Sequence, residues 1–161
     1  MDNSDFEKFY NKALKFLSYR PRSEKEVRDR LRIKIKDLRI KDTGQLIDDV
    51  IEKLKKQRFI NDEEFARLWV ENRLRFKPRS SRLIKLELKQ KGINPETINS
   101  LQLTIDNDLD SARKLVEKRI GRLKGLEKQE IYEKLGRFLA SRGFNWDTIK
   151  RSVDEVLGKG V

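Results

Sequence analysis

A recurring signal for the end of one helix and the start of the next constrains the fold of this chain more than any other feature. The stretches KGINPETI at 91–98 and RGFNWDTI at 142–149 share a basic residue, Gly, an apolar residue, Asn, any residue, an acid, Thr and Ile. Glycine commonly follows the last turn of a helix, and asparagine accepts a hydrogen bond from the first turn of the next. Each stretch therefore predicts two helices joined by a tight turn.

Two further similarities divide the chain into three units. YRPRSEKEVRDRL at 19–31 and FKPRSSRLIKLEL at 76–88 share a basic-Pro-Arg-Ser entry, in which Ser23 and Ser80 are the predicted N-caps. A third pattern spaces Ala, an aliphatic residue and Arg at i, i+4 and i+7. Its matched alanines stand 53 and 46 residues apart, within the period of helical repeat arrays. It occurs as Ala13-Leu17-Arg20, Ala66-Val70-Arg73 and Ala112-Val116-Arg119.

These patterns predict an all-α fold of three tandem three-helix repeats that form an elongated, curved modular rod. The repeats are expected at 1–61, 62–106 and 107–161, and the second is the most basic. Because each repeat has a thin core, its neighbours should bury part of its surface. The alternative is a single compact bundle whose caps are alike because every helix needs caps. The expected helices are 5–20, 23–36, 44–57, 62–75, 80–91, 95–103, 108–122, 127–141 and 146–157.

The acidic cluster in QRFINDEEFARLWVENR at 57–73 poses a choice between catalysis and helix capping. With Asn61 as N-cap, Glu64 completes a capping box, and Asp62 and Glu63 lie in the first turn near the positive end of the helix dipole. Catalysis would require opposing carboxylates or a metal-binding loop, and the stretch contains neither. The interpretation is capping, with Phe65 and Trp69 further along on a core stripe.

Composition excludes several classes of function. The chain has no Cys and no His, so disulfides, thiolate chemistry, zinc sites and imidazole catalysis are not expected. We expect no enzyme activity, no cofactor and no metal. Neither a signal peptide nor an apolar span of membrane length is recognisable, and we expect a cytoplasmic protein. The 39 Lys and Arg against 27 Asp and Glu give a net charge of +12, which favours an anionic partner.

The positive charge is densest in the second repeat. Eight basic residues lie between 73 and 91 against the single acid Glu87. Helical spacing places a row of Arg82, Lys85 and Lys89 opposite the expected core face. Leu86 lies beside this row as an apolar anchor. A row in the first repeat is diluted by acids, so a solvated face is an equal alternative there. The candidate binding residues are Arg73, Arg75, Lys77, Arg79, Arg82, Lys85, Leu86 and Lys89 in the second repeat, and Lys25, Arg28, Arg32 and Lys36 in the first.

Four strings of the chain together resemble the RecX family, regulators of the bacterial RecA recombinase. They are LSYRPRSEKEVRDRL, IDDVIEKLKKQRFINDEEFARLWVENR, RSSRLIKLELKQKGI and LGRFLASRGFNWDTI, and the resemblance covers roughly residues 10–157. It implies a cytoplasmic protein of three tandem three-helix repeats that binds RecA filaments. Such a regulator restrains strand exchange and the RecA-stimulated self-cleavage of the SOS repressor. The partner's identity comes from the resemblance alone.

Two functional hypotheses follow. In the first, the protein binds as a monomer in the helical groove of a RecA-DNA filament and inhibits RecA, in DNA repair and the SOS response. In the second, it is a direct DNA-binding regulator with helix-turn-helix-like modules. Against the second, the basic rows lack the Asn or Gln companions common in base readout, and no extended aromatic platform for single strands is recognisable. Both hypotheses allow non-specific binding of single- or double-stranded DNA at low salt.

Overall fold

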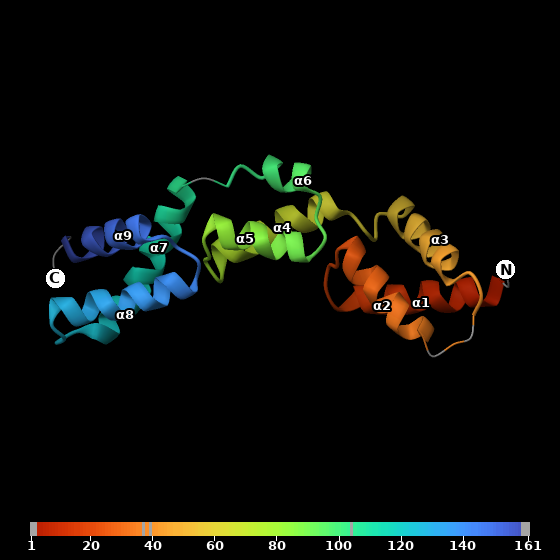
Figure 1. Ribbon diagram of the computed structural model, residues 1–161, viewed down its shortest axis with the longest axis horizontal. Coiled ribbons are helices and arrows are strands. Elements are labelled where there is room, and N and C mark those ends of the chain that lie inside the picture. The colour runs from red at the N-terminus through yellow and green to blue at the C-terminus, as the bar shows by residue number, and fades with distance from the viewer. Residues whose placement is uncertain (1–2, 37, 39, 104, 159–161) are drawn as a thin grey trace. The chain divides into compact units, whose positions relative to one another are not determined.

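The computed structural model describes residues 3–36, 38, 40–103 and 105–158, and these contain helices and turns but no strand (Figure 1). The all-α class and the three tandem three-helix repeats are confirmed. The first repeat contains α1 (Asn3–Tyr19), α2 (Glu24–Lys36) and α3 (Thr43–Lys56). The second contains α4 (Asp62–Arg75), α5 (Ser81–Gln90) and α6 (Pro95–Ser100). The third contains α7 (Ile105–Ile120), the 3-10 helix η1 (Gly121–Leu123), α8 (Lys128–Ser141) and α9 (Trp146–Gly158).

The helix boundaries differ most from prediction on either side of residue 104. Helix α6 was expected to reach residue 103 but ends at Ser100, and Gln102 adopts a left-handed backbone with φ 52°. Asn and Ser are poor formers of a helix interior, so the last residues of α6 do not extend it. Helix α7 begins earlier than predicted, at Ile105, and its end tightens into η1.

The predicted N-caps are confirmed. Each side-chain oxygen accepts a hydrogen bond from a backbone N–H in the first turn that has no partner within the helix. Ser23 and Glu26 form a reciprocal capping box, because the Ser23 N–H also donates to the Glu26 carboxylate at 3.0 Å. The capping distances are 3.3 Å from Glu26 N to Ser23 Oγ, 3.1 Å from Glu64 N to Asn61 Oδ1, 3.1 Å from Leu83 N to Ser80 Oγ, 2.8 Å from Glu96 N to Asn94 Oδ1 and 2.8 Å from Thr148 N to Asn145 Oδ1.

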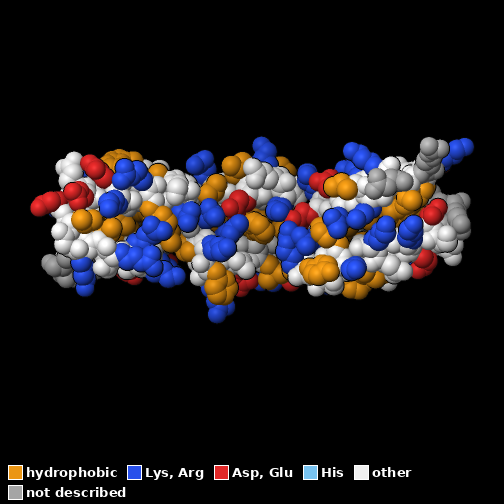
Figure 2. All heavy atoms as spheres, turned by 90° about the horizontal axis from the view of Figure 1, so that it is seen from below, with side chains coloured by type: hydrophobic (Ala, Val, Ile, Leu, Met, Phe, Trp, Pro, Cys, Tyr) orange, Lys and Arg blue, Asp and Glu red, His pale blue; other side chains and the backbone are white. Residues whose placement is uncertain are grey.

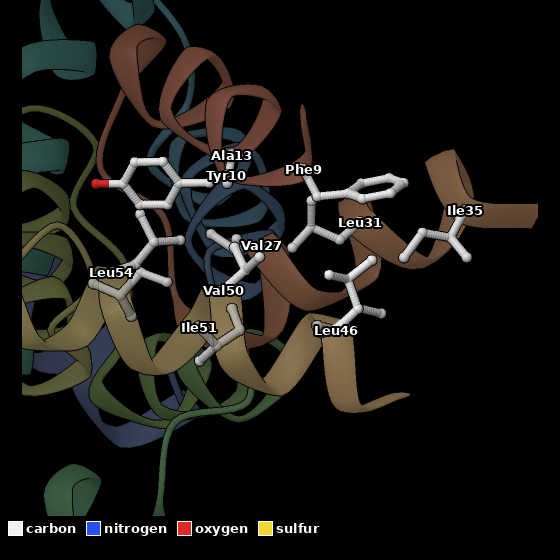
Figure 3. Packing of buried hydrophobic residues seen from close by; sticks show 12 residues of the cluster. Phe9, Tyr10, Ala13, Val27, Leu31, Ile35, Leu46, Val50, Ile51 and Leu54 are labelled. Atoms are coloured by element: carbon white, nitrogen blue, oxygen red, sulfur yellow. The ribbon is translucent and has the colours of Figure 1, made fainter. Parts of the chain in front are cut away.

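The chain divides into two compact units. Unit 1 comprises Met1–Arg67 and Leu88–Ile98, and unit 2 comprises Leu68–Glu87 and Asn99–Val161. In unit 1, the apolar faces of α1, α2 and α3 enclose one core (Figure 3). Apolar positions three or four apart supply each face, as amphipathic helices require. The buried cluster is Phe9, Tyr10, Ala13, Val27, Leu31, Ile35, Leu46, Ile47, Val50, Ile51, Leu54 and Ile60.

In unit 2, helices α7, α8 and α9 form the second core. Phe144 before α9 and Ile149 within α9 are both buried in this cluster, in the positions of a hydrophobic staple. Partly buried side chains from η1 and the following turn pack against it. The buried cluster is Ala112, Leu115, Val116, Ile131, Leu135, Leu139, Phe144, Ile149 and Val153.

The second repeat contributes to both units and forms neither alone. Phe65, Ala66, Leu88, Ile93 and Ile98 are its buried apolar residues in unit 1, whereas Ile84 is buried in unit 2. The limits of the two compact units therefore do not coincide with the limits of the repeats. The repeat limits at 61/62 and 106/107 stay predictions, and so does the curved arrangement of the repeats.

Unit 1 contains a joint between the first and second repeats, which we call joint 1. The Ser23 hydroxyl donates to the carbonyl oxygen of Lys91 at 2.7 Å, and the Glu24 N–H donates to Asp62 Oδ1 at 2.8 Å. Gly92 has φ 78°, and a Cβ there would lie 2.7 Å from the Cβ of Lys25. Only glycine allows both this backbone and this approach.

Unit 2 contains the equivalent joint between the second and third repeats, joint 2. The Ser80 N–H donates to the carbonyl oxygen of Arg142 at 3.0 Å, and the Ser81 N–H donates to Asp108 Oδ1 at 2.7 Å. Gly143 has φ 90°, and a Cβ there would lie 2.9 Å from the Cβ of Leu83. The glycines of the repeated octapeptides therefore follow the end of a helix and also leave room for a side chain of the preceding repeat.

Candidate partner-binding surface

The acids at the start of α4 lie at a helix end, as expected. Asp62 accepts the Glu24 N–H of joint 1, so it caps a second helix as well as lying in the first turn of its own. Burial raises the pKa of Asp62, and the hydrogen bond from Glu24 acts in the opposite direction. Within the described residues, no three His, Cys, Asp or Glu side chains gather as metal ligands.

Helix α5 presents the basic row that its spacing predicts. Ile84 and Leu88 are fully buried, whereas Arg82 and Lys89 are exposed and Lys85 is half-buried. Leu86, the expected anchor, keeps 43% of its surface exposed. In the described part of the chain, Arg82, Lys85 and Lys89 form no ion pair. This row therefore has charge available for a partner.

Two of the candidate residues form ion pairs with Glu87. Arg73 Nε lies 2.9 Å from Glu87 Oε2, and Arg79 Nε lies 3.4 Å from Glu87 Oε1. The Trp69 indole N–H also donates to Glu87, at 2.9 Å, and the Arg73 guanidinium lies 4.8 Å from the Trp69 ring centre. The prediction that Phe65 is in the core is confirmed, but that for Trp69 is wrong, because its polar N–H keeps it half-buried beside Glu87.

The remaining two candidates of the second repeat lie around the loop between α4 and α5. Arg75 is exposed, and its guanidinium lies 5.1 Å from the centre of the Phe76 ring. Lys77 is exposed and has no ion-pair partner among the described residues. Phe76 keeps 61% of its surface exposed, which is unusual for a ring of this size. It is not among the binding residues predicted from the sequence.

The row on α2 is largely neutralised. Lys25 pairs with Asp29 at 2.7 Å, and Arg32 lies 3.2 Å from the same carboxylate. Arg28 pairs with Asp48 at 2.6 Å and also with Glu24, four residues earlier on α2, at 3.7 Å. Lys36 is exposed, without an ion-pair partner in the part of the chain that is described. The contrast favours α5 over α2 as the charged binding face.

Joint 1 contains a partly buried ion cluster around Glu26. One Glu26 oxygen, Oε1, lies 2.7 Å from Arg20 Nη2 and 2.7 Å from Lys91 Nζ. Burial acts to raise the pKa of Glu26, but hydrogen bonds from Arg20, Lys91 and the Ser23 backbone outweigh it and lower the pKa to about 2. The cluster therefore ties the first repeat to the second.

Basic groups outside the predicted rows are also exposed. Figure 2 shows Lys and Arg side chains spread over the face that it presents, with hydrophobic side chains between them and fewer acidic ones. In unit 2, Lys114 and Lys118 of α7 and Arg142 after α8 lie in one groove with the α4–α5 loop. These three were not predicted from the sequence, since each has an ordinary local context and only folding brings them together.

Tandem three-helix repeats with an unpaired basic face define a helical-repeat binding protein, and comparison with known proteins identifies its family. Family models match three segments in order: the first three-helix domain of RecX at 10–37, the second at 61–100 and the third at 106–153. The chain belongs to the RecX family.

Relatives of similar sequence carry the name Regulatory protein RecX. The protein from Bacillus velezensis is 34% identical over 94% of this chain, and the one from Clostridioides difficile is 32% identical over 98%. The chain spans 56% of the length of the first relative and 72% of the second. Both names describe regulatory proteins.

Solved structures agree with the fold. The crystal structure of RecX from Lactobacillus salivarius is 29% identical, has a TM-score of 0.72, and matches over 94% of this chain and 96% of its own. A second crystal structure of a regulatory protein RecX, 24% identical with a TM-score of 0.69, supports the fold alone. Among the described helices, none is long and apolar enough to cross a membrane.

Proposed function

We propose that this protein binds the RecA-DNA filament in the cytoplasm as a monomer and inhibits RecA. The inhibited activities are the ATPase, strand exchange and stimulated repressor cleavage, so the protein modulates DNA repair and the SOS response. RecA as the partner rests on membership of the RecX family. The observation that carries the proposal is the row of α5 cations without ion pairs beside the exposed Leu86.

The chemistry of this row suits a surface of carboxylates or phosphates. An exposed arginine such as Arg82 can bind either group with two parallel hydrogen bonds, whereas Lys85 and Lys89 supply point charges. Leu86 adds an apolar contact between the charges, and such a contact gains affinity when it is buried. Acidic protein surface and the DNA backbone inside a filament would both satisfy these side chains.

Repetition of the module adds a second source of affinity. Contacts made by one repeat hold the others near their sites on neighbouring RecA protomers, so binding is strengthened by effective concentration. The loss of one repeat's contacts should therefore weaken binding by more than its share of the surface. The filament groove, which the second duplex and the repressor also use, is the proposed position of the chain.

Alanine substitution on α5, matched by substitution on α2, tests the proposal. Replacing Arg82, Lys85 and Lys89 together should weaken inhibition of the RecA ATPase and strand exchange about a hundredfold, since three lost contacts at roughly 1 kcal/mol each total about 3 kcal/mol. The control replaces Lys25, Arg32 and Lys36, which removes the same charge. Circular dichroism confirms folding. Unchanged inhibition by the folded α5 variant, or equal losses in both variants, would contradict a specific role for α5.

A direct DNA-binding regulator is the second candidate function, and the same unpaired α5 cations favour it. Non-specific attraction to phosphates should weaken steeply with salt, each neutralised phosphate steepening the log-log slope by about 0.7 to 0.9. Titration with duplexes of different sequence, with and without RecA, separates the two functions. Tight, sequence-selective binding at physiological salt without any effect on RecA would establish the second.

A further inference from the structure

A basic groove lies in unit 2 at joint 2. Its volume is about 710 Å³, and three elements line it: the α4–α5 loop, helix α7 and the region around the end of α8. It combines six cationic side chains with one carboxylate, Glu117, and two aromatic rings. The cations are Arg75, Lys77, Arg79, Lys114, Lys118 and Arg142.

Most of this charge has no acidic partner. Arg79 is paired with Glu87, and Lys114 Nζ lies 3.1 Å from an Asp110 carboxylate oxygen. Lys77 and Lys118 form no ion pair with any described residue, and both are exposed. A concave surface of one charge sign concentrates ligands of the opposite sign. The groove therefore selects an anionic ligand.

The two aromatic rings, Phe76 and Phe138, add apolar surface to the basic groove. Phe76 is exposed and has the Arg75 guanidinium 5.1 Å from its ring centre. Phe138 is half-buried, with the Arg119 guanidinium 3.6 Å and the Arg142 guanidinium 5.1 Å from its ring centre. Phe138 is thus already covered by cations. Phe76 offers a flat apolar ring to a ligand, directly beside Lys77.

We infer that this groove binds single-stranded nucleic acid, with phosphates on Lys77 and Lys118 and a base stacked on Phe76. Grooves of this kind combine cations along the backbone with aromatic platforms for bases. A duplex keeps its bases stacked inside and cannot present one to Phe76 without unpairing. An acidic peptide would satisfy the lysines but offers no base to the ring. The inference does not depend on RecA as the partner.

The chain supplies a matched control for Phe76. Tyr19 stands in the same position of the motif before α2, followed by Arg-Pro-Arg-Ser, and keeps 73% of its surface exposed. The cation after it, Arg20, is paired with Glu26, whereas Lys77 is unpaired. The two aromatic residues therefore share exposure and motif and differ in the charge beside them.

The test measures fluorescence anisotropy of a short labelled oligo(dT) with the full chain, and an oligo(U) checks whether the sugar matters. Phe76→Ala should weaken binding about tenfold, in the range measured for the loss of one stacked base. Tyr19→Ala should leave binding unchanged. Lys77→Ala with Lys118→Ala should reduce the log-log salt slope by about 1.4, which is two phosphates at about 0.7 each. Replacing Lys124 and Lys150, which are outside the groove, should leave the slope unchanged.

Three outcomes would overturn the inference in proteins whose circular dichroism is unchanged. One is equal weakening by Phe76→Ala and Tyr19→Ala. Another is a full salt slope after loss of both groove lysines. The third is binding of a poly-glutamate peptide that displaces oligo(dT) and is equally sensitive to Phe76→Ala, which would assign the groove to an acidic protein segment.

Discussion

The two joints are formed by equivalent segments of the repeats but differ at one central position, where joint 1 has a carboxylate and joint 2 an apolar side chain. In joint 1, Glu26 holds Arg20 and Lys91, one cation from each repeat. At the matching position of joint 2 stands Leu83, which lies against Gly143 next to Arg142. The cations that correspond to Arg20 and Lys91 are Lys77 and Arg142, and both lie in the basic groove.

This difference shows how a repeat protein can keep a fold and change a function. Hydrogen bonds from the N-capping serine and from the backbone N–H of the next residue hold both joints together, so the geometry does not require an ion cluster. In joint 1 the carboxylate neutralises the cations and strengthens the contact between repeats. In joint 2 an apolar residue leaves the cations without an acid and so available to a ligand.

The largest effect is expected from the glycines that both joints share. Gly143→Ala should lower the free energy of unfolding by about 3 kcal/mol, because it combines a left-handed backbone with a collision against Ser80 Oγ and Leu83. Gly92→Ala should cost about 2 kcal/mol, because its closest contact, with the Lys25 Cβ at 2.7 Å, is less close than the contact that Gly143→Ala makes with Ser80 Oγ. Urea denaturation followed by circular dichroism measures both.

Gly125 is the control for these two glycines. It has φ 87° but nothing within 4 Å of an added Cβ, so Gly125→Ala should cost only about 1 kcal/mol of backbone strain. Losses of the same size at all three positions would show that the close approach of the repeats contributes nothing beyond the left-handed conformation.

The next largest effect is a pH-dependent contribution to stability that only joint 1 should show. Glu26→Gln should lower the stability of unit 1 by about 2 kcal/mol at neutral pH, after allowance for partial solvent screening. Because the pKa of Glu26 is lowered to about 2 on folding, its contribution is present above the ordinary pKa of about 4.5 and is lost as the pH falls toward 2. The measurement is the difference in unfolding free energy between wild type and variant at pH 7 and pH 3.

Glutamine resembles a protonated glutamate, so the two proteins should converge in acid. A stability difference that stays constant from pH 7 to pH 3 would contradict the assignment of charge to this cluster. Leu83→Gln in joint 2 provides the comparison, because it introduces an amide where no carboxylate titrates and its effect should not vary over this range.

A glutamate at residue 83 of joint 2, as at residue 26 of joint 1, should neutralise the neighbouring cations. Leu83→Glu is expected to weaken oligo(dT) binding about tenfold, because a carboxylate near Arg142 and Lys77 competes with phosphate for the same cations. Leu83→Gln has the same size without the charge and should bind within twofold of the wild type. Retention of full affinity in the glutamate variant would show that the charge difference between the joints does not control the groove.

The smallest effect concerns the carboxylates that cap the neighbouring repeat. Asp108 accepts hydrogen bonds from both the N–H and the hydroxyl of Ser81, at 2.7 and 2.6 Å, whereas Asp62 accepts one from Glu24. Asp108→Ala should cost about 1 kcal/mol and Asp62→Ala about half of that, because burial already disfavours the charged form of Asp62. Thermal unfolding measured side by side can rank them, and the reverse order would contradict this account.

Local signals predicted much of the fold. Ser23, Ser80, Asn61, Asn94 and Asn145 cap the helices that follow them, because a cap depends on residues within one turn of chain. Helix spacing likewise placed Ile84 and Leu88 inside and Leu86 outside. The end of α6 was predicted less well, since Asn and Ser before a left-handed Gln102 do not signal one definite stop.

The candidate site was predictable only in part. Spacing on one helix identified Arg82, Lys85 and Lys89, but it could not show that Arg73 and Arg79 converge on Glu87. That convergence joins residues from two helices and a loop, so their partner is set by packing. For the same reason Trp69 was assigned to the core, although its indole N–H donates to Glu87 and the side chain stays half-buried.

The sequence by itself determined that this protein is a series of capped helices in three similar repeats, with an excess of positive charge. Caps, glycine turns and apolar spacing act over a few residues, so their physics can be read along the chain. Which cations remain unpaired was decided only by the tertiary structure. The repeats meet at residues far apart in sequence, and there a carboxylate at 26 or a leucine at 83 determines whether Arg and Lys are neutralised within the protein or left for a ligand.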